Sequence, residues 1–413
     1  MLTLQSRLSI TLFIISLSLI SLTRTRIANL PVGPGELLLL LWDLGAILNL
    51  SLIHKVRLSK TAKHIVFFLL LLMLALLVSM LVNVNGIYFY KCKYWHFAIA
   101  IFFTLLSNIL FFILHGSTVE VFFAVRRFLF LLLSLWGLVY IASKISLLPI
   151  DYLWYSSRFT AGAKNPNQAA LYLVAIPFLG FWIFNISSDK FTRLLCGIII
   201  ISCIALGFLT QSDALYVAWS VSGSLIFLLY FFKKYFTIKS LNSLIVFFLI
   251  LILIMVAIGF NWSSLFSLFQ KIISRYLEGD SGNSFMGTNV RFLLWYNALL
   301  VILESPITGF GPGSFSGKES PFLCAEAHNS ILDWGMSTGL LGIIFYLLVQ
   351  FYFFKKVFIK KQYWLLGAIV SLFVLSCFHF IFRHPIFWFL QASITILADG
   401  MSSRNFNYIG NKG

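Results

Sequence analysis

The stretch EAHNSILDWGMSTGLLG (residues 326–342) brings an acid, a histidine and an amide together immediately before an apolar run. A histidine titrates near neutral pH, so His328 suits a general base or a hydrogen-bond partner for a phosphate. Glu326 and Asp333 are close enough in sequence to orient or perturb it, Glu326 in a structural or coupling role, and Asn329 adds a donor for a phosphate or a sugar. The alternative is an ordinary interfacial histidine without chemistry.

Arginines form a second set of candidates. Arg291 stands in NVRFLLW, and Arg126 and Arg127 come six and seven residues into the apolar run VFFAVRRFLFLLLSLW. Arginine at that depth is costly and normally faces a cavity, an acid or an anionic substrate, whereas snorkelling to a nearby interface is the equally weighted alternative. Asp213, in LTQSDALYVAW, is a candidate partner for one of these two arginines in a structural pair.

Two shorter motifs carry further donors and turns. In AGAKNPNQAALYL, Lys164 and Asn167 offer donors for a sugar or a phosphate, although Asn-Pro is equally an ordinary turn. In SPITGFGPGSF, Gly311 and Gly313 permit positive φ on either side of a proline, which predicts a turn. Such a turn can fold the Arg291 segment back onto the start of the next apolar run; a plain connection is the alternative.

These residues are positioned by an extremely apolar chain. The 413 residues are 60% hydrophobic and only 10% charged, with a mean hydropathy of +0.95, far from the roughly 25% charged residues of a soluble domain. Runs long enough to cross a ~30 Å hydrocarbon core as helices recur from end to end. We therefore predict an all-α polytopic membrane protein, one integral membrane domain over residues 1–413, with about 12 transmembrane helices near residues 8–23, 36–53, 64–82, 96–114, 119–142, 168–186, 194–211, 213–232, 241–260, 338–354, 364–382 and 385–399.

Charged loops set the orientation. With a cytoplasmic N-terminus, the basic segments HKVRLSKTAKH, KKYFTIK and KKVFIKK all fall on the cytoplasmic side, as the positive-inside rule requires. The segment 289–304 is then a helix on the extracytoplasmic surface of the membrane, because counting it as a crossing would put KKVFIKK on the extracytoplasmic side. Residues 261–337 become one large periplasmic loop, and loops of that length usually carry function.

The net charge of +17 has the same origin. Lys and Arg gather in short clusters between spans, so the charge indicates contact with membrane lipids and not with nucleic acid. The five cysteines show no CxxC spacing. Of these, Cys92 and Cys324 are placed where they could meet outside the membrane, but we expect them to be unpaired thiols.

The order of the motifs resembles a known family. NPNQAALYL, LTQS, NVRFLLWYNAL with SPITGFGPGSF, and AHNSILDWGMSTGLLG follow one another as they do in the O-antigen ligase and polymerase superfamily of bacterial cell-surface polysaccharide assembly. The resemblance runs over roughly residues 160–345. Its last two motifs are the most specific, and the N-terminal spans match only in being hydrophobic.

The resemblance implies an all-helical, GT-C-like glycosyltransferase of the bacterial inner membrane whose active site faces the periplasm and needs no metal or cofactor. The implied donor is a glycan carried on undecaprenyl pyrophosphate, the acceptor is a glycan or lipid A-core, and a chain-length regulator is a further expected partner. By motif position, His328 corresponds to the essential loop histidine of the family, and Arg291 to the arginine that helps to bind the pyrophosphate.

One departure matters. Where many members read TQSRG, this chain has Gln211, Ser212 and Asp213, so an aspartate replaces an expected arginine. We hypothesise that Arg126 or Arg127 supplies the missing charge. The missing arginine favours a polymerase of O-antigen or capsule repeat units over the alternative, an O-antigen ligase. A flippase for the same lipid-linked glycan and a non-catalytic scaffold are the alternatives from other classes.

Overall fold

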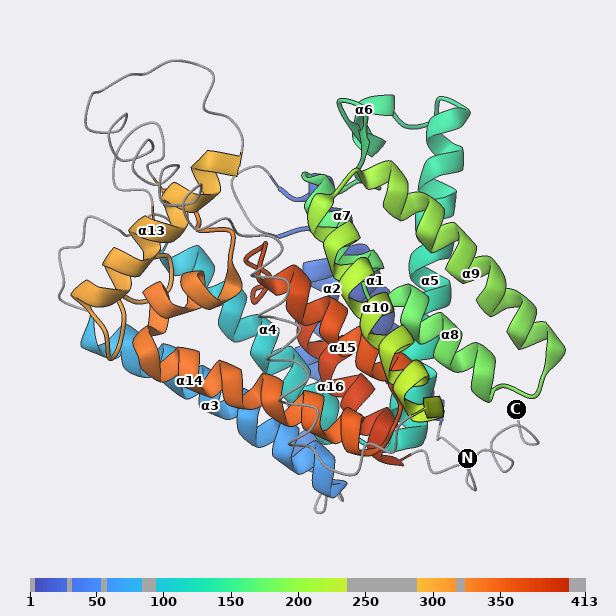
Figure 1. The fold of residues 1–413 in the computed structure, drawn as a ribbon, viewed down its shortest axis with the longest axis horizontal. Coiled ribbons are helices and arrows are strands. Elements are labelled where there is room, and N and C mark those ends of the chain that lie inside the picture. The colour runs from blue at the N-terminus through green and yellow to red at the C-terminus, as the bar shows by residue number, and fades with distance from the viewer. Residues whose placement is uncertain are drawn as a thin grey trace.

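The computed structural model describes residues 4–27, 32–52, 58–83, 94–235, 288–316 and 324–400. Within these ranges the chain is helical apart from one short antiparallel hairpin, as predicted from composition (Figure 1). The elements are α1 (Leu4–Leu19), η1 (Thr23–Thr25), α2 (Pro34–Leu52), α3 (Lys60–Val82), α4 (Tyr94–His115), α5 (Thr118–Lys144), α6 (Ile150–Leu153), β1 (Trp154–Tyr155), β2 (Arg158–Phe159), α7 (Pro166–Leu173), α8 (Ile176–Ile186), α9 (Lys190–Thr210), α10 (Asp213–Tyr235), α13 (Thr288–Glu304), α14 (Ser330–Ile359), α15 (Tyr363–Ser376) and α16 (Pro385–Gly400).

Helices occupy the predicted apolar runs, except that the run 241–260 lies outside the described residues. In the described ranges seven helical segments are long and apolar enough to cross a membrane, and α1 and α15 are shorter apolar helices. The helix expected over 289–304 is present as α13 and is not among those seven. Much of the predicted 261–337 loop also falls outside the described residues.

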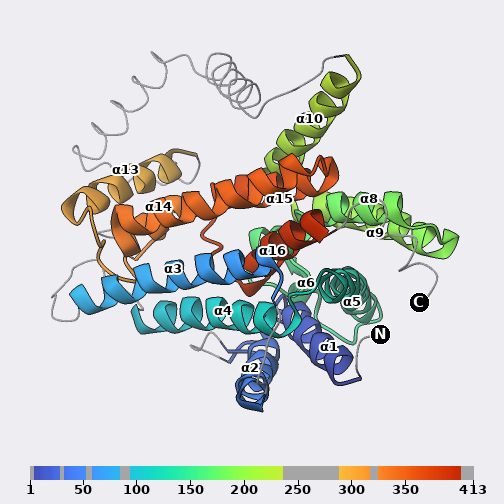
Figure 2. The same cartoon turned by 90° about the horizontal axis from the view of Figure 1, so that it is seen from below.

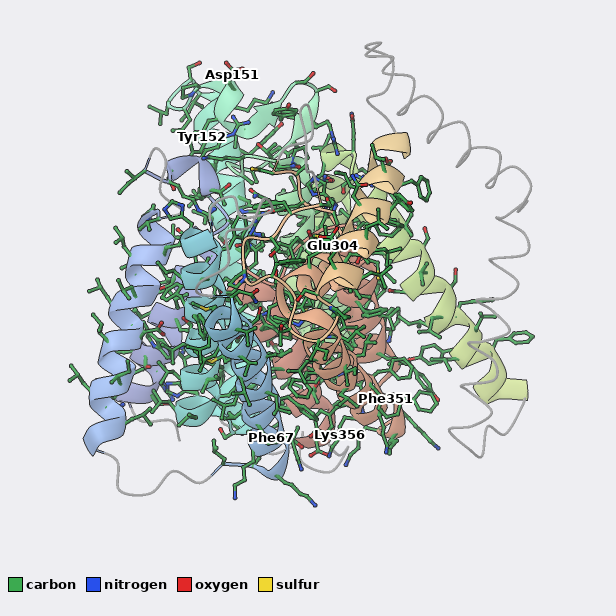
Figure 3. The ribbon with its side chains drawn as sticks, turned by 90° about the vertical axis from the view of Figure 1, so that its left-hand side faces the viewer. Phe67, Asp151, Tyr152, Glu304, Phe351 and Lys356 are labelled. Carbon is green, nitrogen blue, oxygen red and sulfur yellow. The ribbon has the colours of Figure 1, made fainter. Side chains whose placement is uncertain are left out.

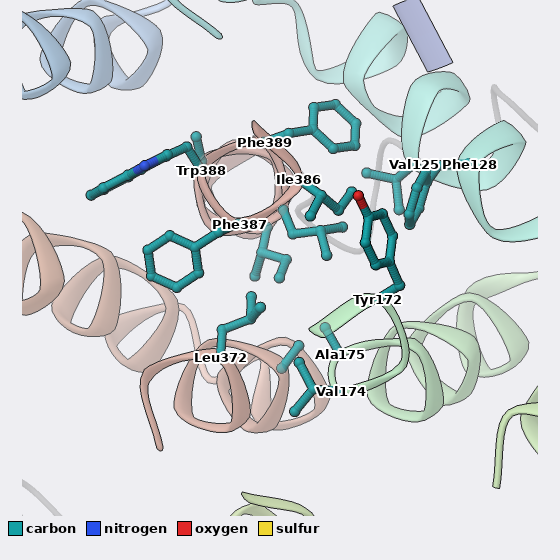
Figure 4. Packing of buried hydrophobic residues seen from close by; sticks show 14 of the residues in the cluster. Val125, Phe128, Tyr172, Val174, Ala175, Leu372, Ile386, Phe387, Trp388 and Phe389 are labelled. Carbon is teal, nitrogen blue, oxygen red and sulfur yellow. The ribbon is translucent and has the colours of Figure 1, made fainter. Parts of the chain in front are cut away.

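The helix α16 lies at the centre of the bundle. Its residues from Pro385 to Ala398 are all buried, and a helix that is apolar all round is typical of a protein interior. Phe387, Trp388 and Phe389 point outward from it in different directions (Figure 4). Neighbours on α5, α7 and α15 surround them, including Phe128, Tyr172 and Leu372. The segment between α15 and α16 is thereby held at the end of a rigid core.

One end of the bundle, which we call the Asp399 end, gathers basic residues. Asp399 pairs with Lys356 (3.4 Å) and Lys360 (3.2 Å) and accepts a hydrogen bond from Thr61. Two of the predicted basic loops therefore meet there, although they are far apart in sequence. In Figure 3 Lys356 lies at this end and Asp151 lies at the other.

The opposite end, which we call the His328 end, is where α14 begins. There α3 runs alongside α14 (Figure 2), and the two helices are linked by the Ser79 hydroxyl, which donates to the Ser337 carbonyl at 2.5 Å. The Asn83 amide nitrogen donates to the Gly309 carbonyl at 3.0 Å. These buried bonds fix the start of α14 against the rest of the bundle.

Candidate functional site

The backbone around His328 is held by a buried carboxyl group. Asp333, 2% exposed in the first turn of α14, accepts hydrogen bonds from the backbone N–H groups of Ala327 (2.8 Å) and Asn329 (3.0 Å). These are the two residues that flank His328, which itself has a left-handed backbone with φ of 53°. A non-glycine residue in that conformation costs energy and persists only when its surroundings fix it. Asp333, an unexplained neighbour in the sequence, is thus the residue that positions His328.

The glycine-proline segment forms the predicted turn and folds α13 back against α14. Phe310 N–H donates to the Met336 carbonyl (2.8 Å), and Leu340 N–H donates to the Pro306 carbonyl (2.7 Å). The turn packs against α14 at Gly339, whose φ of 64° interrupts the helix. The prediction that this turn brings the Arg291 helix to the start of the next apolar run is confirmed.

Arg291 lies in the first turns of α13, half-buried beside the histidine segment. Trp295, one turn further along, donates from its indole nitrogen to the Ala327 carbonyl at 2.9 Å. The Arg291 charge acts on the rings of both His328 and His379. Two distant motifs of the sequence therefore share one site.

Glu326 forms an ion pair with Arg383, which lies in the segment between α15 and α16. A second contact joins Arg383 Nη2 to Glu326 Oε2 at 3.4 Å. The guanidinium also stacks over the ring of Phe97, at 5.0 Å from its centroid. The structural role expected for Glu326 is this pairing, which ties the His328 loop to the far end of the sequence.

The electrostatic surroundings keep His328 neutral. Its side chain remains accessible, but the surrounding protein desolvates it and lowers its pKa. Glu326 raises that pKa, while the positive charges of Arg291 and Arg383 lower it further. The net direction is downward, so His328 is available as a hydrogen-bond acceptor or base at neutral pH.

His379 is a residue of this site that sequence reasoning missed. It is 8% exposed, its ring lies edge-on to that of His328 with centroids 6.5 Å apart, and in the described part of the chain its Nε2 has no hydrogen-bond partner. Burial and then the charges of Arg291, His328 and Arg158 lower its pKa to about 3. The signal was FHFIFRHP (378–385), which sets two histidines and an arginine among apolar residues; the prediction placed His379 inside the span 364–382.

The motifs NPNQ and LTQS also meet at the His328 end. Ser212 donates to the Asn167 side-chain oxygen at 2.9 Å, between the start of α7 and the start of α10. Lys164 has an exposed side chain beside them, and its backbone N–H donates to the Thr23 hydroxyl at 2.8 Å. Arg158, from β2, donates to the carbonyls of Thr210 and Gln211 at the end of α9.

Arg126 and Arg127 are not brought into this site. Arg126 contacts Thr192 in the first turn of α9 (3.4 Å), whereas Arg158 contacts Thr210 in the last. At 1.5 Å per helical residue these two points are roughly 27 Å apart. Arg127 donates to the carbonyl of Arg7 and the hydroxyl of Thr11, near the start of α1. Both arginines make these hydrogen bonds close to the Asp399 end. This contradicts the hypothesis that either of them replaces the missing family arginine.

One further expectation is corrected and another stays open. Asp213 is exposed at the first residue of α10, and among the described residues no ion pair joins it to Arg126 or Arg127, which contact Thr192 and Arg7 instead. Asn329 is the N-cap of α14, and its side-chain oxygen accepts from the N–H groups of Ile331 (3.0 Å) and Leu332 (3.3 Å). That oxygen is committed to the helix, whereas the expected donor is the side-chain amide nitrogen, so a substrate-binding role for Asn329 stays a prediction.

Cys324, close to Glu326, is disulfide-bonded, so the expectation of an unpaired thiol is wrong for this residue. Its partner lies outside the described residues, as does Cys92. Among the described cysteines, Cys196, Cys203 and Cys377 are free. Within the same described ranges, no cluster of three or more His, Cys, Asp or Glu side chains is arranged to hold a metal ion.

Comparison with known proteins finds a family match over part of the chain. Residues 197–347 match the family described as O-antigen ligase. The match runs from within α9 to the middle of α14 and includes Arg291 and His328. It confirms the resemblance inferred from the motifs. No curated protein sequence matches the chain.

Proposed function

We propose, on the premise of the O-antigen ligase match over residues 197–347, that the protein transfers a glycan from undecaprenyl pyrophosphate to a sugar hydroxyl. The observation that carries the proposal is the strained His328 backbone, held between two Asp333 hydrogen bonds and beside two guanidinium groups. A residue held in a costly conformation at an accessible, positively charged spot is typical of a functional site.

His328 acts on the acceptor in this reaction. The acceptor oxygen attacks the anomeric carbon of the donor glycan, and the hydroxyl proton passes to the neutral imidazole. The bond between the anomeric carbon and the pyrophosphate oxygen breaks, and its electron pair leaves with the lipid pyrophosphate. The lowered pKa of His328 keeps the ring unprotonated before the attack.

Arg291 acts on the leaving group. Negative charge grows on the pyrophosphate oxygens as the glycosidic bond breaks, and a planar guanidinium can donate two parallel hydrogen bonds to them. In the described residues Arg291 forms no ion pair, whereas Arg383 is paired with Glu326. The Arg291 charge is thus available for the lipid-linked pyrophosphate, and Arg383 mainly fixes the loop.

We place the His328 end at the periplasmic face of the bacterial inner membrane. Disulfides persist in oxidising compartments such as the periplasm, and Cys324 lies four residues before His328. The basic residues around Asp399 are at the opposite end, where the positive-inside rule expects the cytoplasm. Two independent features support the same orientation.

Purified protein supplied with an undecaprenyl-pyrophosphate-linked repeat unit tests the proposal. The wild type should form longer glycans, and His328→Ala and Arg291→Ala should not. Arg127→Ala is the matched control for Arg291, because it removes the same charge at the Asp399 end of the bundle. The site assignment is refuted when both site variants extend the glycan as fast as the wild type.

The acceptor separates two candidates. Asp213 in place of the family arginine favours a polymerase that joins O-antigen or capsule repeat units, whereas the description of the matched family favours a ligase. Deletion of the gene distinguishes them. Loss of a polymerase leaves lipopolysaccharide with a single repeat unit, while loss of a ligase leaves bare core and accumulates lipid-linked polymer.

A further inference from the structure

We propose that Arg158 and His379 form a second phosphate-binding subsite, which holds one phosphate of the lipid pyrophosphate while Arg291 holds the other. This inference rests on the proposed function and goes beyond it, because neither residue lies in a matched motif: both fall outside residues 197–347. It also answers how the chain compensates for the arginine absent at Asp213.

Arg158 is fixed by the backbone with donors to spare. Its Nε donates to the Thr210 carbonyl at 3.1 Å and its Nη2 to the Gln211 carbonyl at 2.8 Å. A guanidinium carries five N–H donors in a rigid fork, so these two bonds set its plane and leave other donors unused. The side chain is half-buried and forms no ion pair within the described residues. It is therefore a pre-oriented cation, bound to the carbonyl of Gln211, which lies two residues before Asp213.

His379 is within reach of the Arg158 charge. The residue is 8% exposed, and its Nε2 lacks a hydrogen-bond partner among the described residues. A buried nitrogen without a hydrogen bond is unfavourable, and a bound ligand would supply the missing bond. The ring lies beside His328, and the Arg158 and Arg291 charges both act on it.

The charge balance of this space selects an anion. The charges of three guanidinium groups act on the two imidazoles. Of the neighbouring acids, Glu326 is paired with Arg383, and Asp333 accepts from two backbone N–H groups. Burial and then the positive potential lower the pKa of His379, so its ring is neutral. A phosphate reverses this potential, and the ring can then donate to a phosphate oxygen while Arg158 donates from its free edge.

The chain offers a closely matched control in Arg24. Its Nε donates to the Ala163 carbonyl at 3.0 Å and its Nη2 to the Trp154 carbonyl at 3.1 Å, and it is half-buried like Arg158. Arg24→Lys and Arg158→Lys therefore cause the same loss of backbone bonds. Of the two charges, that of Arg158 acts on His379.

The test measures binding to the purified full chain in detergent. The probes are undecaprenyl pyrophosphate, undecaprenyl monophosphate, inorganic pyrophosphate and phosphatidylglycerol. We expect Arg158→Lys to weaken binding of undecaprenyl pyrophosphate about tenfold or more, and binding of the monophosphate less than about threefold. His379→Ala should reduce the preference for undecaprenyl pyrophosphate over the monophosphate. His379→Gln, which retains a donor, should restore part of that preference.

Each other outcome overturns the inference. The subsite is refuted when Arg158→Lys leaves the preference for pyrophosphate over monophosphate unchanged, or when Arg24→Lys narrows it equally. Phosphatidylglycerol competing as well as undecaprenyl pyrophosphate would make the site a general lipid contact. If Arg291→Lys weakens binding and Arg158→Lys does not, the second subsite is refuted and the proposed function stands. If the wild type does not bind the lipid pyrophosphate, the proposed function itself is refuted.

Discussion

The substitution Asp333→Asn tests whether the backbone around His328 is built for chemistry. It keeps the size of the side chain but turns one acceptor oxygen into an N–H donor. Asp333 now accepts from Ala327 N–H at 2.8 Å and from Asn329 N–H at 3.0 Å. An asparagine can accept from one of them, and the other then faces a donor.

The expected loss follows from that geometry. A buried N–H left without an acceptor costs roughly 1–3 kcal/mol. Since His328 is held at a φ of 53° between the two bonds, this cost falls on the conformation of the loop. It lowers the population of the active arrangement, and hence the rate of glycan transfer, by about 5-fold to 150-fold. Binding of undecaprenyl pyrophosphate should change less than about threefold, because Arg291 lies on another helix.

The assay is glycan extension by purified protein under saturating donor, with Asp151→Asn as the control. That control makes the same chemical change at an exposed residue of α6 and should leave the rate unaltered. The decisive comparison is with His328→Ala. If Asp333 acts through His328, adding Asp333→Asn to His328→Ala causes no further loss. Losses that multiply, or an Asp333→Asn variant as active as the wild type, would refute the reasoning.

Three other predictions follow from the same geometry. The lowered pKa of His328 keeps it neutral to a lower pH than an ordinary histidine, so kcat/KM should decline only below pH ~6.5. Glu326→Gln removes a charge that raises this pKa and should move the acid limb to lower pH, while Arg383→Gln should move it higher. Gly339→Ala should cost more than about 3 kcal/mol in thermal unfolding, because φ is 64° and a Cβ would lie 2.4 Å from the Ile307 carbonyl; Gly223→Ala, with no atom within 4 Å, should be neutral. A membrane-impermeant maleimide applied to intact spheroplasts should label Cys324 only after reduction, and labelling without reductant would contradict the disulfide.

The sequence alone determined the class of the molecule and indicated its candidate histidine. Continuous apolar runs leave helices as the economical way to satisfy the backbone in a membrane, so the fold class follows from composition. The motifs around His328, Arg291 and the Gly-Pro turn are local, and their order along the chain was enough to indicate the family that residues 197–347 match. The turn folds as predicted because Gly311 and Gly313 adopt the positive φ that the pattern requires.

The tertiary structure decided which charges surround that histidine. Arg126 and Arg127 lie within an apolar run, which suggested that they face the substrate. Their position along the run does not show which end of the bundle they are near, and their contacts place them at the Asp399 end. Arg158 and Arg383 come from connections between predicted spans, and His379 comes from the end of the predicted span 364–382. They reach the site because α16 is packed at the centre and β2 folds over the end of α9. Local patterns determine which segments become helices and turns, whereas long-range packing determines which side chains meet.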